Sequence, residues 1–114
     1  LAERIAEFCA KKKLVNNRAS FDSGAIARLP DWPGPGEHPG TELADHLAQV
    51  PAGTYLLVGH PATKDEAIHH IRHEGLAPGD VAMQRNRQRR MFMDIEIIDY
   101  CENVGIELLR YTDL

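Results

Sequence analysis

The chain has 114 residues, of which 43% are hydrophobic and 26% charged, and its formal net charge is -4 at pH 7. This length and composition are typical of one globular domain with a single core, and no stretch approaches the roughly 20 apolar residues that a membrane-spanning helix needs. The acidic balance argues against a general affinity for nucleic acid, so we expect residues 1–114 to form one domain of a cytoplasmic protein with neither a nucleic-acid nor a membrane partner.

The first predicted element is a helix in the sequence LAERIAEFCAKK, in which Leu1, Ile5 and Phe8 repeat at helical spacing. Nothing precedes them that could cap a helix, and the chain does not begin with Met, so we expect a piece of a longer polypeptide. The two cysteines, Cys9 and Cys101, both lie among helix-patterned apolar residues. This favours reduced thiols in a core over a disulfide.

A strand, a loop and a second helix are predicted next. Residues 14–21 (LVNNRASF) predict a short strand. Residues 29–40 are rich in Pro and Gly, which predicts an irregular loop. Trp32 and His38 are the loop side chains best suited to contact a ligand. The alternative is that Trp32 packs against the rest of the domain and anchors the loop. Residues 41–50 then show the spacing of a helix that buries one face, formed by Leu43, Leu47 and Val50.

Residues 54–58 predict a strand that ends abruptly at Gly59, His60 and Pro61. Its apolar residues are consecutive rather than alternating, which is typical of a parallel strand covered on both faces. In folds built on parallel strands, functional groups gather just beyond the carboxyl ends of the strands. An imidazole held there can act as a general acid or base near neutral pH. The alternative is that His60 only caps the strand or bonds a neighbouring loop.

Residues 65–75 predict a helix that Thr63 and Glu66 start as a capping box. His69 and His73 lie at i and i+4 on it, which is the geometry of paired zinc ligands. The motif lacks the glutamate that serves zinc proteases as general base, and no third ligand can be named. We therefore interpret these histidines as a solvated polar face and keep a zinc enzyme as a third hypothesis.

A long helix and a last strand complete the pattern. The helix is expected to start between Val81 and Arg89 and to carry these side chains inward: Met93, Ile97, Cys101 and Val104. Gly105 offers the left-handed residue that ends a helix, and residues 106–111 predict a strand. Because a helix lies between each strand and the next, the order predicts an α/β fold with parallel strands.

Four arginines cluster near the start of that helix: Arg85, Arg87, Arg89 and Arg90. Guanidinium groups bind phosphate and carboxylate well. The alternatives are a solvated turn, or pairing with the acidic outer face of the helix, where Arg90 and Asp94 lie at i and i+4. The sequence has no dinucleotide, Walker, C-x-x-C or G-x-S-x-G motif, so dinucleotide, nucleotide, redox and α/β-hydrolase functions have no support.

Three segments together carry a family resemblance: PAGTYLLVGHPA, the arginine-containing VAMQRNRQRR and the final VGIELLRYTDL. They resemble the C-terminal half of the YdjC-type carbohydrate deacetylases, relatives of the polysaccharide deacetylases, and the similarity spans essentially the whole chain. The resemblance implies part of an irregular (β/α) TIM-like barrel with parallel strands. It also implies a hydrolase that removes acetyl groups from N-acetylated sugars or oligosaccharides with a divalent metal, zinc or magnesium.

The resemblance assigns roles to single residues. His60 matches the family's histidine after a late barrel strand, which protonates the departing amine. Arg87 is the best match to the arginine before the last helix, which binds substrate or organises the site, and Arg85 is nearly as good. Trp32, on its loop, is the other candidate substrate contact. The family's metal ligands belong to its first half, and this chain has no Asp-Asp motif of that kind, so the ligands are expected outside it.

Part of a barrel leaves open strand edges and an apolar face. We therefore expect the chain to be inactive by itself, and either to form a homo-oligomer or to associate with the missing N-terminal part. The alternative is a small α/β binding or interaction module without catalytic activity. In that hypothesis His60 is structural and the arginine cluster binds a phosphate or an acidic partner.

Overall fold

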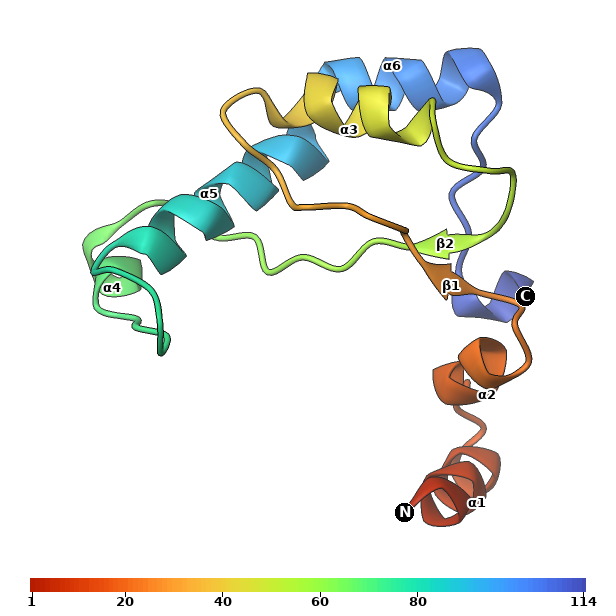
Figure 1. The fold of residues 1–114 in the computed structure, drawn as a ribbon. Coiled ribbons are helices and arrows are strands. Elements are labelled where there is room, and N and C mark those ends of the chain that lie inside the picture. Colours follow the sequence, from red (N-terminus) through yellow and green to blue (C-terminus); the bar gives the residue numbers. More distant parts are fainter.

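The fold, a computed structural model of all 114 residues, is mainly helical and contains one small sheet (Figure 1). In chain order its elements are α1 (Ala2–Lys12), α2 (Asn17–Asp22), β1 (Ala27–Arg28), α3 (Pro39–Leu47), β2 (Tyr55–Leu56), α4 (Glu66–His69), α5 (Asp80–Met93), α6 (Ile95–Val104) and the 3-10 helix η1 (Tyr111–Asp113). None of these helices has both the length and the apolar character to span a membrane.

Three helices, α3, α5 and α6, form the packed part of the molecule, which we call the helical unit. Helix α3 lies against both α5 and α6. The core cluster consists of Leu29, Leu43, Met91 and Ile97. Met91 is only 1% exposed. Leu47 and Val50 also pack against this cluster, so the inward face predicted for Leu43, Leu47 and Val50 is confirmed, although the helix ends at Leu47 and Val50 lies beyond it.

The sheet is parallel, as the sequence predicts, and its register is Ala27 opposite Tyr55 and Arg28 opposite Leu56. Helix α3 connects the two strands, as parallel pairing requires. Each strand has only two residues, so the predicted strand over residues 54–58 is shorter than expected. Val58 is 52% exposed, and the prediction of a strand covered on both faces is therefore wrong.

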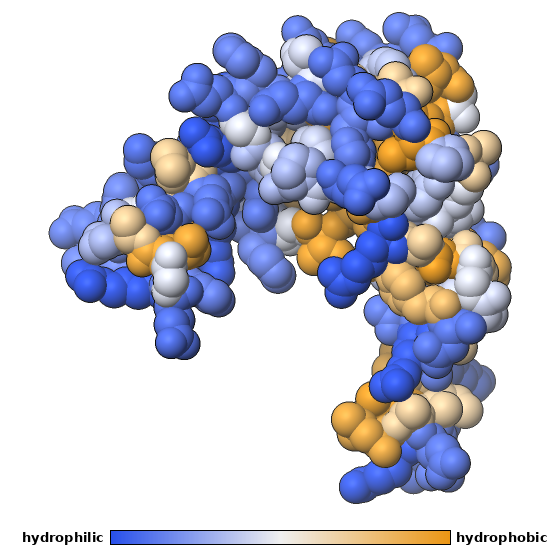
Figure 2. All heavy atoms as spheres, viewed as in Figure 1, coloured by the Kyte–Doolittle hydropathy of each residue, from blue (hydrophilic) through white to orange (hydrophobic).

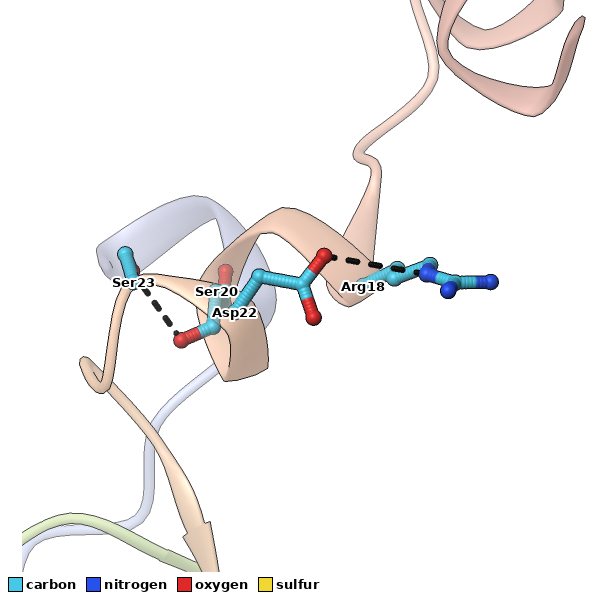
Figure 3. Close-up of polar contacts among 4 residues, drawn as sticks. All are labelled: Arg18, Ser20, Asp22 and Ser23. Carbon is cyan, nitrogen blue, oxygen red and sulfur yellow. Dashed lines mark hydrogen bonds and ion pairs between the residues drawn. The ribbon is translucent and has the colours of Figure 1, made fainter. Parts of the chain in front are cut away.

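The N-terminal arm, residues 1–24, extends away from the helical unit and carries α1 and α2 (Figure 1). Neither helix has a buried residue. Helix α2 is held by local contacts: Arg18 pairs with Asp22 at 3.7 Å, and the Ser23 hydroxyl donates to the Ser20 carbonyl at 3.1 Å (Figure 3). Contacts of this kind are exposed to water and contribute little to stability.

The chain as a whole exposes more surface than a compact protein of its mass. Its accessible surface is 8576 Å², whereas about 6,200 Å² is typical of a compact chain of this size. The radius of gyration is 16.8 Å, against about 13 Å for a compact domain. Only 9 of 114 residues are buried. Figure 2 shows apolar side chains on the surface of the arm and in the hollow between the arm and the helical unit.

Two of the predicted strands are wrong. In residues 14–21, apolar and polar side chains do not alternate after Val15, and Asn16 takes the extended conformation of a helix N-cap, so α2 forms there. Residues 106–111 pair with no strand, because β1 and β2 pair only with each other. The ends of this segment are tied to helical turns instead: Ile106 N–H donates to the Cys101 carbonyl at 2.8 Å, and Arg110 N–H donates to the Asp113 carboxylate at 2.7 Å.

The helix predicted over residues 65–75 is a single turn, α4, which ends at His69. Its N-cap is Asp65, whose carboxylate accepts from Ile68 N–H at 3.0 Å, so the capping box predicted from Thr63 is wrong. Helix α4 buries no residue. A longer helix would therefore gain no packing to offset the entropy of ordering its backbone.

The long helix predicted before Gly105 is two helices that meet at Asp94. This residue is extended, with ψ 123°, and its carboxylate accepts from Glu96 N–H at 3.0 Å as the N-cap of α6. The break changes which side chains face the core. Ile97 is 7% exposed, as predicted, but Met93 is 69% exposed and Val104 53% exposed, so their inward placement is wrong.

Other local predictions are confirmed. Gly105 ends α6 in the left-handed region, with φ 75°. The predicted loop over residues 29–40 is irregular as far as His38, and α3 begins at Pro39. Cys9 and Cys101 are free thiols, and both are half-buried. Cys101 packs against the core cluster as predicted, whereas Cys9 lies on α1, which has no buried residue.

Candidate functional site

The segment that carries His60 lies along α5. The backbone N–H of His60 donates to Gln88 Oε1 at 2.5 Å, and Ala62 N–H donates to the Arg85 carbonyl at 3.2 Å. These two bonds join the loop after β2 to a helix more than twenty residues later in the chain. The position of the His60 backbone is thus fixed by the helical unit rather than by the short sheet.

Gly59 lets this segment approach α5 closely. A Cβ atom at Gly59 would lie 2.5 Å from a ring carbon of Phe92 and 3.3 Å from Gln88 Oε1. The first distance is shorter than any ordinary carbon contact. A side chain at this position would therefore require either the exposed Phe92 ring to rotate or the loop to move away from α5.

The side chain of His60 is exposed and takes part in no hydrogen bond, although its backbone is held. The sequence left open whether His60 bonds a neighbouring loop. The structure gives the imidazole no protein partner, so it is free to meet a ligand from solvent.

A polar cavity of about 320 Å³ lies between the proline-rich loop and α5. Its lining residues are Pro33, Gly34, Pro35, Gln84, Arg87 and Gln88. The residues from α5 lie on one helix face at i, i+3 and i+4. Two amide side chains and one guanidinium thus surround the cavity, and Gln88 belongs both to this cavity and to the bond that holds His60.

Arg87 is the arginine of its cluster that lines the polar cavity, and like Arg85 its side chain has no partner within the chain. Arg89 donates to Asn86 Oδ1 at 3.0 Å, and Arg90 donates to the Glu37 carbonyl at 3.3 Å. Arg87 is half-buried, lines the polar cavity and has no hydrogen bond or ion pair. A guanidinium in this situation has unused donors that face the cavity.

Arg85 and Trp32, the other candidate substrate contacts, do not line the polar cavity. Arg85 contributes its backbone carbonyl to the loop of His60. Trp32 packs against the core cluster, with its ring 5.2 Å from that of His46 at an interplanar angle of 58°. The nitrogen Nε2 of His46 lies 2.7 Å from the Pro30 carbonyl, so this pair anchors the loop. Trp32 therefore anchors the loop, which is one of the two roles that the sequence left open.

The histidines proposed as zinc ligands do not share a helix. Helix α4 ends at His69, and His73 lies beyond it with Nδ1 at 2.8 Å from the Glu74 carbonyl. The expected i and i+4 geometry is therefore wrong. Nowhere does the structure gather three or more His, Cys, Asp or Glu side chains in a position to hold a metal ion.

A second, smaller cavity of about 80 Å³ lies between the two strands and the C-terminal segment. Its lining is mostly apolar and includes Tyr55, Leu56, Leu109 and Tyr111. Cys101, on α6, packs against the core cluster. Burial raises the pKa of its thiol because the charged thiolate is less stable away from water. Neither feature provides a nucleophile or a polar binding site.

Gln84 and Gln88 are the site residues that the sequence does not single out. Their one signal is the spacing with Arg87, which places three polar side chains on one face of a helix. A scan against protein-family models and searches of curated proteins and of solved structures found no match to this chain. The polar cavity and the loop of His60 are thus the observations from which a function can be inferred.

Proposed function

We propose that this chain is part of a cytoplasmic, metal-dependent carbohydrate deacetylase that hydrolyses the acetamido group of N-acetylated sugars. The observation that carries the proposal is the double role of Gln88, which lines the polar cavity and holds the backbone of His60 at 2.5 Å. One side chain, Gln88, thus belongs to the cavity that would receive the sugar and holds the backbone of the residue that carries the imidazole.

The cavity suits a sugar by size and by chemistry. Small-molecule sites typically have volumes of about 300–1,000 Å³, and this cavity of about 320 Å³ would hold one sugar ring. The amides of Gln84 and Gln88 can donate to and accept from hydroxyl groups, while Arg87 donates only. Ring hydroxyls and an acetamido carbonyl present the matching partners.

His60 supplies the acid that amide hydrolysis needs. When the C–N bond breaks, its electron pair stays on nitrogen, which cannot leave as a bare amide anion. The imidazolium of His60 donates a proton to this nitrogen, the product leaves as an amine, and a neutral imidazole remains. Its exposed side chain on a fixed backbone has the freedom and the anchorage that this proton transfer requires.

The residues present do not fit the divalent metal that deacetylases of the resembled family use. No group of three or more potential ligands comes together in the structure. The metal site of the proposed enzyme must therefore be formed by polypeptide other than these residues. We expect the chain by itself to bind sugar but not to hydrolyse it.

A barrel architecture is also part of the proposal. His60 follows β2, whose partner β1 runs parallel to it, so the imidazole lies beyond the carboxyl ends of parallel strands. Catalytic residues in barrels of alternating strands and helices occupy that position. The two exposed edges of this small sheet are where further strands of an irregular barrel would pair.

Sugar binding by the isolated chain tests the proposal. Titration with N-acetylglucosamine oligosaccharides should shift the backbone NMR signals of Gln84, Arg87 and Gln88, and deacetylated glucosamine oligosaccharides should bind more weakly. Arg87→Ala should weaken binding by about tenfold, since it removes a charged donor. Arg89→Ala, a matched change of an arginine that lies outside the cavity and bonds only within α5, should leave binding unaltered. Failure of N-acetylated sugars to bind, or equal binding by the Arg87 variant, refutes the assignment.

The second candidate is a binding module without catalysis, which the unpaired guanidinium of Arg87 favours. In this case the cavity receives an anionic group, such as a phosphate, in place of a sugar ring. Inorganic phosphate would then shift the same NMR signals while neutral N-acetylated sugars would not. A competition titration between the two ligands separates these functions.

A further inference from the structure

Helix α1 has an apolar stripe that nothing in the chain covers. Leu1 is 89% exposed, Ile5 37% and Phe8 56%, and no residue of the helix is buried. Arg4 and Lys11 stand four residues before and three residues after Phe8, so both lie beside it on the helix surface. The stripe is therefore apolar, with two basic side chains beside it and the acidic Glu7 next to both of them.

Helix α6 has an uncovered face of the opposite charge. The side facing the core carries Ile97, which is 7% exposed, whereas Ile95 is 63% exposed and Ile98 44% exposed. Asp99 and Glu102 stand four and seven residues after Ile95, on the same outer face. This face therefore has two exposed isoleucines, followed on the same side by two acidic side chains.

The two surfaces cannot meet within one chain. Helix α1 lies at the far end of the N-terminal arm, and α6 lies on the opposite side of the molecule, against α3 (Figure 1). Figure 2 shows apolar side chains exposed on the end of the arm. Each surface is free to receive a partner from another molecule.

We propose that the occupant of both surfaces is a second copy of this chain, in a two-fold dimer where α1 of each copy packs on α6 of the other. The exposed apolar side chains of the two helices would pack together, and Arg4 and Lys11 of α1 would lie near Asp99 and Glu102 of α6 in both contacts. A two-fold arrangement makes the contact reciprocal, so neither surface remains open.

The exposed area agrees with such a dimer. Each chain has about 2,300 Å² more accessible surface than a compact chain of its mass. A stable interface of standard size buries about 800 Å² on each partner. The chain thus has enough surplus surface for two helix contacts, and this inference holds whether or not the chain is a deacetylase.

Light scattering and sedimentation of the 114-residue chain test the dimer. The wild-type chain should have twice the monomer mass from micromolar concentrations upward. Phe8→Glu should raise the dissociation constant by about a thousandfold, because one substitution damages both symmetry-related contacts. The control is Ala10→Glu, which adds the same charge on the opposite face of α1 and should leave the mass unchanged. Circular dichroism shows whether both variants keep their helices.

Charge exchange identifies the partner surface. Lys11→Glu and Glu102→Lys should each raise the dissociation constant by about tenfold, and the double variant should restore the wild-type value because the two charges then face each other again. A monomeric wild-type chain, a dimer indifferent to these substitutions, or an open assembly that grows with concentration would each overturn the proposal.

Discussion

The helical unit and the N-terminal arm are both helical, but only the first has a core. In the helical unit, side chains from α3, α5 and α6 meet Leu29, which follows β1, in one cluster around Met91, which is 1% exposed. In the arm, α1 and α2 have no buried residue, and their hydrogen bonds and ion pair are local. The two regions thus separate helix formation from tertiary packing within one chain.

The comparison shows where the stability of this chain must come from. Isolated helices shorter than about 12–15 residues are marginal in water, and α1 has 11. Its favourable features, acidic Glu3 in the first turn and basic Lys11 and Lys12 in the last, each contribute less than about 1 kcal/mol. Burial of apolar side chains contributes several times more, so the helical unit should determine the unfolding of the whole chain.

The largest effect should follow from emptying the core. Met91→Ala should lower the free energy of unfolding by about 2–5 kcal/mol, because it leaves a cavity among side chains that cannot collapse fully. Leu14→Ala removes a similar side chain from the arm, where Leu14 is 56% exposed, and should cost less than about 0.5 kcal/mol. Urea denaturation of both variants measures the difference. Equal losses would mean that the arm is packed as tightly as the core.

A smaller loss should follow from Gly40→Ala at the contact of α3 with α6. Alanine normally favours a helix over glycine by about 1 kcal/mol. Here the added Cβ would overlap the carboxyl group of Asp94 and lie 2.9 Å from its Cβ, which cannot rotate away. The side chain that caps α6 would be displaced, so we expect a net loss of about 1–2 kcal/mol. A variant more stable than wild type in the same denaturation experiment would show that α6 can shift.

How much the sequence predicts follows from the same distinction between local and distant interactions. The stripe on α3 and the left-handed end at Gly105 depend on residues within a turn or two, and both are confirmed. The strand over residues 106–111 is wrong because a strand also needs a neighbour with free hydrogen-bonding groups. Sequence periodicity does not report whether that neighbour exists.

The same distinction between local and distant interactions applies to the candidate site. His60 could be chosen from sequence because Gly and Pro flank it at the end of an apolar run, whereas Arg87 was singled out from its basic cluster only by the family resemblance. The bond from His60 N–H to Gln88 could not, since the two residues are 28 positions apart and an amide side chain has no distinctive pattern. The break at Asp94 was hidden for a different reason: aspartate is a good N-cap and also a tolerable helix residue.

Thiol reactivity compares the two regions without changing their packing. Burial raises the pKa of Cys101 on α6, so at a given pH less of it is the reactive thiolate than in the unfolded chain. In mildly alkaline buffer, iodoacetamide should therefore modify Cys101 more slowly in the native chain than in urea, and its rate should rise with pH over a higher range. Cys9, on the arm, should react at similar rates in both conditions. Single-cysteine variants and mass spectrometry separate the two rates, and a Cys101 that reacts equally fast when native would contradict its burial.

The smallest effect should come from the most visible contact of the arm, the ion pair between Arg18 and Asp22 (Figure 3). Its side chains are 56% and 70% exposed and 3.7 Å apart at i and i+4, so water and salt screen it well. Arg18→Ala should lower the free energy of unfolding by less than about 0.5 kcal/mol, and the difference should vanish in high salt. Denaturation at low and high ionic strength measures this, with Arg72→Ala, a change of an exposed arginine that has no ion pair, as the matched control. A loss comparable to that of Met91→Ala would mean that α2 contributes to global stability and that the arm is not the independent region described above.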